Sequence, residues 1–254
     1  MFPIRDDNPS LSTPMFTYLV VALNAAAWVL LQGMGAEPAL SASVCHLGLI
    51  PGELLGLAPD GLKVPISQTA ACVIHHDAAN WLSPFTSMFL HGGWFHILGN
   101  MWFLWLFGDN VEDSMGHVRF ACFYVICGLA AAAAQAFSDP ASAVPMVGAS
   151  GAIGGVMGAY AVTFPHARVD MLITLGFYVT HAAVPAYLML GYWFLLQIIG
   201  GVPALQSEGG GVAFWAHAGG FLAGVVLSFV FRNPDRLAAQ HRARMRQQLF
   251  GYSD

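Results

Sequence analysis

The sequence predicts an all-α polytopic membrane protein, a bundle of six membrane-spanning helices with a long first loop at the outer membrane interface. Of the 254 residues, 57% are hydrophobic and only 9% are charged, whereas a typical soluble domain has about a quarter charged residues. The mean hydropathy is +0.62. A chain this apolar belongs in a lipid bilayer. Its net charge of −5 gives no indication of nucleic-acid binding.

Apolar runs that could each cross a bilayer recur along the chain, since a spanning helix needs about 20 mostly apolar residues. The expected spans are residues 16–34, 94–107, 118–137, 150–165, 186–199 and 212–231. The second should end at Gly108-Asp109-Asn110. An apolar stretch over 169–185, broken by Gly176 and His181, precedes the fifth span. Glycines between positions 200 and 211 predict a flexible loop before the sixth.

The first loop, residues 35–90, is too apolar in places to be a plain linker, so we expect short amphipathic pieces at the interface. Cys45 and Cys72 lie in it and could form a disulfide if the loop faces an oxidising compartment. Cys122 and Cys127 lie within the third span, where they should act as small hydrophobic residues. His75-His76-Asp77 could bind a metal, although a wet interfacial loop explains the same residues.

The cationic residues give an independent indication of topology, because Lys and Arg favour cytoplasmic loops. With six spans and a cytoplasmic N-terminus, eight of the nine fall on the cytoplasmic side and only Lys63 falls outside. We therefore expect residues 1–15 to be a cytoplasmic N-terminus, 16–231 the membrane domain and 232–254 a basic cytoplasmic tail. The loop before Ser150 then lies on the outer side, and the inner membrane of a bacterium is the expected location.

Five polar residues lie in three of the expected spans, near their outer ends: His91, His96 and Asn100 at the second, Ser150 at the fourth and His217 in the sixth. Polar groups in spans are costly and usually face the protein interior. Each could merely tie helices together, and Ser150 could merely cap a helix. His96 and Asn100 are four residues apart, on one helix face. Together the five residues indicate a shared site.

The chemistry of these residue types fits a nucleophilic site. A serine hydroxyl becomes a good nucleophile when a neutral histidine takes its proton, so Ser150 and His217 are the candidate nucleophile and base. His96, Asn100 and backbone N–H groups could stabilise an oxyanion. With no acid in the second, fourth or sixth expected span, a serine–histidine dyad is the arrangement that remains. No metal ligand set or cofactor motif is indicated.

Glycines spaced four apart predict close packing of the fourth and sixth spans, which would let Ser150 reach His217. These glycines are Gly151 with Gly155, Gly154 with Gly158, and Gly220 with Gly224. Generic packing by small residues explains the same spacing.

From Gly148-Ala149-Ser150-Gly151, Ala216-His217 and His91-x4-His96-x3-Asn100, the chain resembles the rhomboid family of intramembrane serine proteases. The resemblance covers about residues 16–231. It implies Ser150 as nucleophile, His217 as base, and His96 and Asn100 as oxyanion donors, with His91 structural. The implied partners are the lipid bilayer and single-span membrane proteins as substrates, with the fifth span and the 200–211 loop gating access.

The chain departs from the family pattern at Trp81-Leu82, where many members have Trp-Arg in the first loop. It also has Gly154 where some members carry a tyrosine that packs on the base, so the residue that orients His217 is open. A non-catalytic membrane protein of the same fold that binds or retains membrane clients is the alternative function. A transporter is less favoured because no internal repeat is evident. A zinc protease is disfavoured because the chain has no His-Glu-x-x-His.

Overall fold

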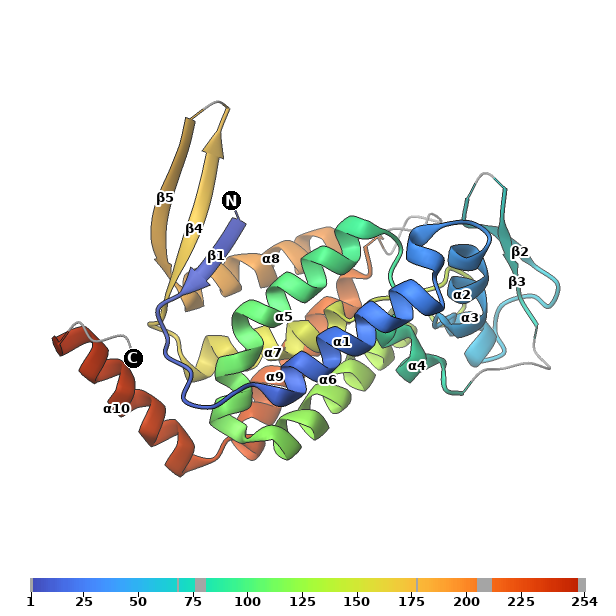
Figure 1. Cartoon of the computed structure of the whole chain (residues 1–254). Helices are drawn as coiled ribbons and strands as arrows, with labels where there is room; N and C mark the ends of the chain where they lie inside the picture. The colour runs from blue at the N-terminus through green and yellow to red at the C-terminus, as the bar shows by residue number, and fades with distance from the viewer. Residues whose placement is uncertain (1, 68, 76–80, 177, 205–211, 251–254) are drawn as a thin grey trace.

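The computed structural model describes residues 2–67, 69–75, 81–176, 178–204 and 212–250 (Figure 1). Its main body is a bundle formed by α1 (Met15–Leu30), α5 (Trp94–Met115), α6 (His117–Ser138), α7 (Ser150–Thr163), α8 (Ala186–Ala204) and α9 (Phe214–Phe231). α7 lies in the middle, in contact with α5, α6, α8 and α9. Residues 151–160 of α7 are all buried, so the neighbouring helices fix the place of its first residue, Ser150.

The helices differ in their fitness to cross a bilayer. Within the described residues, three are long and apolar enough to do so: His117–Ser138, Ala186–Pro203 and Phe214–Phe231. α1 is apolar but shorter, α7 has 14 residues, and α5 carries acidic residues near its end. The chain is a mostly helical integral membrane protein. A count of six spans additionally requires α1, α5 and α7 to cross.

α5 continues to Met115, so the prediction that this span ends at Gly108-Asp109-Asn110 is wrong. The chain at the start of α1 stabilises the polar end of α5. The buried Glu112 carboxylate accepts hydrogen bonds from the backbone N–H groups of Phe16 and Thr17, both at 2.8 Å. Such first-turn N–H groups have no partner within their own helix. Glu112 therefore caps α1, an interaction that hydropathy alone does not reveal.

The fold is mostly helical, as expected, but it is not all-α, because residues 168–185 form a β-hairpin. β4 (Arg168–Leu175) and β5 (Tyr178–Pro185) pair antiparallel, and β1 (Phe2–Asp6) adds antiparallel to β4, giving the strand order β1-β4-β5. Val169 and Met171 are buried on one face of β4, the two-residue period of a strand. Gly176, with φ of +62°, lies in the turn of the hairpin. The sheet projects from the bundle beside α8 (Figure 1).

The first loop folds into short elements at the opposite end of the bundle from this sheet (Figure 1). They are η1 (Gly33–Gly35), α2 (Ala39–Leu47), α3 (Pro51–Leu54), β2 (Lys63–Pro65), β3 (Ala71–Val73), α4 (Ser83–Thr86) and η3 (Ser87–Phe89). A disulfide joins Cys45 to Cys72. Backbone hydrogen bonds between Leu49 and Met146 attach the loop to the segment before α7. The loop thereby borders the start of α7.

The basic tail forms a helix, α10 (Pro234–Phe250), which contacts α5. The buried Gln240 side-chain amide donates to the Asn110 carbonyl at 3.1 Å. Arg244 donates to the His166 carbonyl at 2.6 Å, just beyond the end of α7. The tail therefore packs against the polar ends of α5 and α7.

Gly200 and Gly201 lie within α8, so the expected flexible loop over 200–211 is wrong for these two positions. They make room for aromatic rings at the start of α9. A Cβ on Gly200 would meet the Phe214 ring at 2.4 Å, and the Trp215 indole N–H donates to the Gly201 carbonyl at 3.2 Å. Residues 205–211 of the expected loop lie outside the described residues.

Candidate active site

Ser150 is the first residue of α7, and the backbone before it is shaped for close approach. Gly148 has φ of +134°, and its N–H donates to the Ser87 carbonyl at 2.9 Å. A Cβ at Gly148 would lie 2.7 Å from His96 Nε2 and 3.3 Å from Ser150 Oγ. A larger residue at 148 would therefore fill the space between these two polar atoms.

The Ser150 side chain makes no capping hydrogen bond at the start of α7, whose N-cap residue is Ala149. Its Oγ lies 2.8 Å from His217 Nε2 on α9. Both side chains are only partly buried. The interpretation of Ser150 as a helix cap is therefore wrong, and its hydroxyl faces the histidine.

The close approach of α7 and α9 makes this distance possible. A Cβ on Gly220 would lie 2.0 Å from the Gly151 carbonyl oxygen, and one on Gly224 would lie 1.9 Å from that of Gly155. A Cβ on each of the other four glycines singled out from the sequence would also be close to a neighbour: 2.5 Å from Ala131 Cβ at Gly151, 2.5 Å from Cys127 Cβ at Gly155, 2.2 Å from the Phe221 oxygen at Gly158, and 3.1 Å from the His217 oxygen at Gly154. Larger residues would separate the two helices.

Two glutamines of the site were not identified from the sequence. Gln135 Oε1 on α6 accepts a hydrogen bond from the backbone N–H of Ala216 at 3.2 Å, and so holds the start of α9. Gln197 Oε1 on α8 lies 2.8 Å from His217 Nδ1. Gln197 could have been identified as the one amide side chain in the apolar 186–199 run, since polar groups in spans usually face the protein interior.

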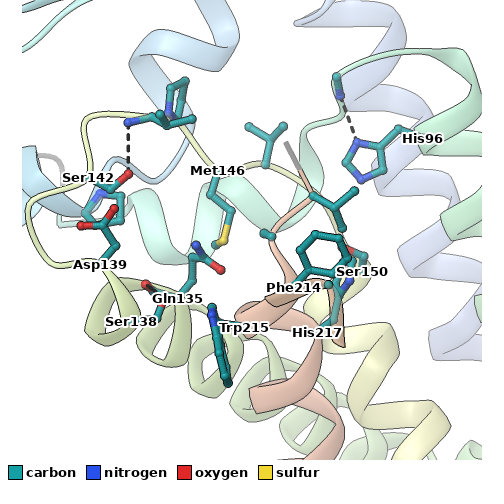
Figure 2. Close-up of a pocket in the computed structure, with 18 of the residues that line it drawn as sticks. His96, Gln135, Ser138, Asp139, Ser142, Met146, Ser150, Phe214, Trp215 and His217 are labelled. Atoms are coloured by element: carbon teal, nitrogen blue, oxygen red, sulfur yellow. Dashed lines mark hydrogen bonds between the residues drawn. The ribbon is translucent and has the colours of Figure 1, made fainter. Parts of the chain in front are cut away.

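His96 and Asn100 of α5 line the cavity that contains Ser150 and His217. His96 Nδ1 accepts from the backbone N–H of Gly92 at 3.3 Å (Figure 2). The ring proton then belongs on Nε2, the nitrogen that faces the space beside Gly148. Asn100 Nδ2 is buried and has no hydrogen-bond partner among the described residues. Two donors are thus available on residues that line the same cavity as Ser150.

His91 lies behind His96, with ring centroids 5.0 Å apart, and is fully buried. The Gln32 side chain holds its backbone on both sides. Gln32 Oε1 accepts from the His91 N–H and Gln32 Nε2 donates to the His91 carbonyl, each at 2.8 Å. His91 does not line the cavity.

The cavity has a volume of about 1320 Å³ and is lined by residues from Pro51 to His217, far apart in the sequence. Figure 2 shows Ser150, His217 and His96 on one side and Gln135 with Asp139 on the other. Residues 62–65 of the first loop and 143–147 before α7 also line it. A chain segment several residues long would fit between these walls.

A metal site finds no support in the part of the chain that the structure describes, where no group of three or more His, Cys, Asp or Glu side chains could hold an ion. His76 and Asp77 lie outside the described residues. The backbone N–H of His75 donates to Glu53 Oε1 at 3.2 Å.

Comparison with known proteins places the chain in a family. A model of the Rhomboid domain matches residues 78–234, more than half of the chain. RHOMBOID-like protein 5 of Arabidopsis thaliana is 32% identical over 144 residues, covering 56% of this chain and 41% of that protein. Rhomboid protease GluP of Bacillus subtilis is 29% identical over 186 residues, covering 73% of this chain and 31% of that protein.

A further Bacillus subtilis protein, putative rhomboid protease YdcA, is 35% identical over 80 residues, covering 32% of this chain and 40% of that protein. The chain thus spans half or less of the length of each of these relatives. The domain match includes His91, His96, Asn100, Ser150 and His217. On that match, the chain belongs to the rhomboid family.

Proposed function

We propose that this protein is an intramembrane serine endopeptidase that cleaves membrane-spanning proteins near the outer face of the bilayer. The observation that carries the proposal is the 2.8 Å contact between Ser150 Oγ and His217 Nε2, facing a cavity of about 1320 Å³. Family membership and two relatives named as rhomboid proteases support it.

In this reaction, His217 Nε2 takes the Ser150 hydroxyl proton as Oγ attacks the scissile carbonyl carbon. The carbonyl oxygen becomes negative and is stabilised by N–H donors of His96 Nε2, Asn100 Nδ2 and the Ser150 backbone. His217 then gives the proton to the leaving amine. Water, activated by the same imidazole, releases the acyl group from Ser150.

Two observations support this oxyanion site. The space beside Gly148 lies within 2.7 Å of His96 Nε2 and 3.3 Å of Ser150 Oγ, close to the spacing that an oxyanion between nucleophile and donor requires. The buried Asn100 amide has no partner among the described residues, and burying such a donor unpaired is costly. An oxyanion would supply its missing acceptor.

The proposed topology has six spans, α1 and α5 to α9, with both termini on the cytoplasmic side. The positions of the cationic residues support it, as do β1 and α10, which lie at the end of the bundle opposite the first loop (Figure 1). Ser150 is then near the outer face. Substrates are single-span proteins with small residues at the cut, entering past α8, and a bacterial inner membrane is the proposed location.

A non-catalytic rhomboid-like protein that binds membrane clients is the second candidate, because several relatives are named only rhomboid-like. Labelling by a fluorophosphonate probe separates the two. The wild-type protein in detergent should become labelled, whereas Ser150→Ala and His217→Ala should not, because the first lacks the nucleophile and the second lacks its base. A folded wild-type protein that resists the probe, with client binding intact, would favour the second candidate.

A further inference from the structure

The His217 imidazole has a hydrogen-bond partner on each nitrogen. Nε2 faces Ser150 Oγ and Nδ1 faces Gln197 Oε1, each at 2.8 Å. Gln197 comes from α8, a third helix, and is 8% exposed. The amide therefore lies inside the bundle, in line behind the base.

The hydrogen bonds around Gln197 fix which end of its amide faces His217. Gln197 Nε2 donates to the Trp193 carbonyl, one helical turn earlier, at 3.2 Å. A flipped amide would bring its oxygen against that carbonyl oxygen, leaving two acceptors in contact. Oε1 is therefore the atom that faces Nδ1.

This orientation fixes the tautomer of the base. A side-chain carbonyl can only accept, so His217 Nδ1 must carry the ring proton. Nε2 then has a free lone pair, the state in which it can accept the Ser150 proton. The other tautomer would set Nδ1 without a hydrogen against Oε1, with two acceptors in contact, and would leave Nε2 unable to act as base.

α8 also packs on the imidazole ring. The Trp193 and His217 ring centroids are 5.7 Å apart. On the α7 side position 154 is glycine, and a Cβ there would already lie 3.1 Å from the His217 carbonyl oxygen and 3.7 Å from the Trp193 ring. No α7 side chain supports the ring at this position, and α8 supplies both a ring contact and a hydrogen bond.

We propose that Gln197 is a positioning residue for the base, holding His217 in its Nδ1-protonated tautomer and aiming Nε2 at Ser150. The inference rests on the proposed function of Ser150 and His217. Ser150, His217 and Gln197 then form a hydrogen-bonded series whose third member lies on α8. The state of the base then depends on α8 remaining docked against α9.

The test combines three substitutions at one position with a control on the same helix. Gln197→Leu removes the acceptor, Gln197→Asn keeps an amide too short to reach, and Gln197→Glu keeps the length and adds charge. The control is Leu196→Ala, at an exposed neighbouring position. Each protein is assayed for fluorophosphonate labelling rate across pH and for melting temperature.

Loss of one hydrogen bond in such a site should slow labelling about tenfold in Gln197→Leu and Gln197→Asn, with little change in Leu196→Ala. Gln197→Glu should label near the wild-type rate at neutral pH. In the Gln197→Glu variant, the loss of labelling rate on the acid side of the pH profile should begin about one pH unit or more higher, because a carboxylate favours the protonated imidazole. The titratable groups that line the same cavity as His217 are His96, Asp139 and Lys63, and they are unchanged in all four variants.

A spectroscopic readout is independent of activity. In ¹⁵N-histidine-labelled protein, the signals lost in His217→Gln identify the His217 ring. They should report a protonated Nδ1 in the wild type and a tautomer mixture in Gln197→Leu. A wild-type protein that never labels would refute the proposed function. Wild-type labelling with unchanged rate, pH profile and ¹⁵N signals in the Gln197 variants would instead refute the role of Gln197 alone.

Discussion

Gly220→Ala should slow the reaction of Ser150 while leaving the protein folded. A Cβ at this position of α9 would lie 2.0 Å from the Gly151 carbonyl oxygen, and real Cβ atoms essentially never come within 3.0 Å of another atom. The two helices must therefore separate by about 1 Å at this level, a typical case of overpacking. Gly151 follows Ser150 directly, and Gly220 lies one turn from His217.

The same displacement acts on the site. The Ser150 Oγ to His217 Nε2 distance, 2.8 Å in the structure, would lengthen to about 3.8 Å, beyond the reach of a hydrogen bond. Because general-base catalysis contributes about 10²- to 10⁴-fold, we expect labelling to slow by about tenfold or more. Overpacking should lower the free energy of unfolding by about 1–3 kcal/mol.

The assay is the rate of fluorophosphonate labelling per folded molecule, measured below the melting temperature of the variant. Gly191→Ala on α8 is the matched control, since a Cβ there has no neighbour within 4 Å. It should label at the wild-type rate, and removing a helical glycine favours the helix by about 1 kcal/mol. If Gly220→Ala also labels at the wild-type rate, the contact between α7 and α9 does not set the position of the base.

Three further predictions separate catalytic from structural polar groups. Asn100→Ala and His96→Ala should each reduce turnover about 10²- to 10³-fold with little change in Tm. His91→Ala should instead lower Tm and keep its turnover per folded molecule. The reverse pattern would make His91 the oxyanion donor and the other two residues structural. Glu112→Gln should cost about 2 kcal/mol of stability by weakening the cap of α1 but leave labelling per folded molecule unchanged, which thermal melting and the probe measure together. Burial raises the pKa of Asp6 to about 7 from its ordinary 3.8, against a hydrogen bond from Tyr160 that lowers it. The folded state then holds the Asp6 proton more tightly than the unfolded state does. The contribution of this proton to the free energy of unfolding is therefore complete below about pH 4 and is lost as the pH rises through 7. Asp6→Asn should flatten this decline in Tm, and parallel curves for the two proteins would contradict the shift.

The sequence predicted the helices where apolar residues dominate, and missed structure where distant segments meet. Helix starts at Trp94, Ser150 and Ala186 coincide with the expected starts of spans. The end of α5 was missed because Glu112 is stabilised by backbone groups 95 residues earlier in the chain. The hairpin at 168–185 was missed because its alternation is short and β1 joins it from the N-terminus.

The spacing of nearby residues predicted part of the site, whereas hydrogen-bond partners distant in the sequence could not be predicted. His96 and Asn100 were expected on one helix face, and both line the cavity. The partner of His217 Nδ1 could not be identified, because Gln197 is 20 residues away on another helix and one amide has no spacing pattern. The sequence could not decide whether Cys45 and Cys72 form the disulfide seen in the structure, because it does not give the distance between the two residues.

The most direct test of the central claim is proteolysis within a bilayer. The wild-type protein and Ser150→Ala are each reconstituted into liposomes with a single-span reporter that has small residues near the outer end of its span. Mass spectrometry then identifies any products. The account predicts one cut in the outer part of the span with the wild-type protein and none with folded Ser150→Ala. The same product from Ser150→Ala, at the same rate, would contradict it.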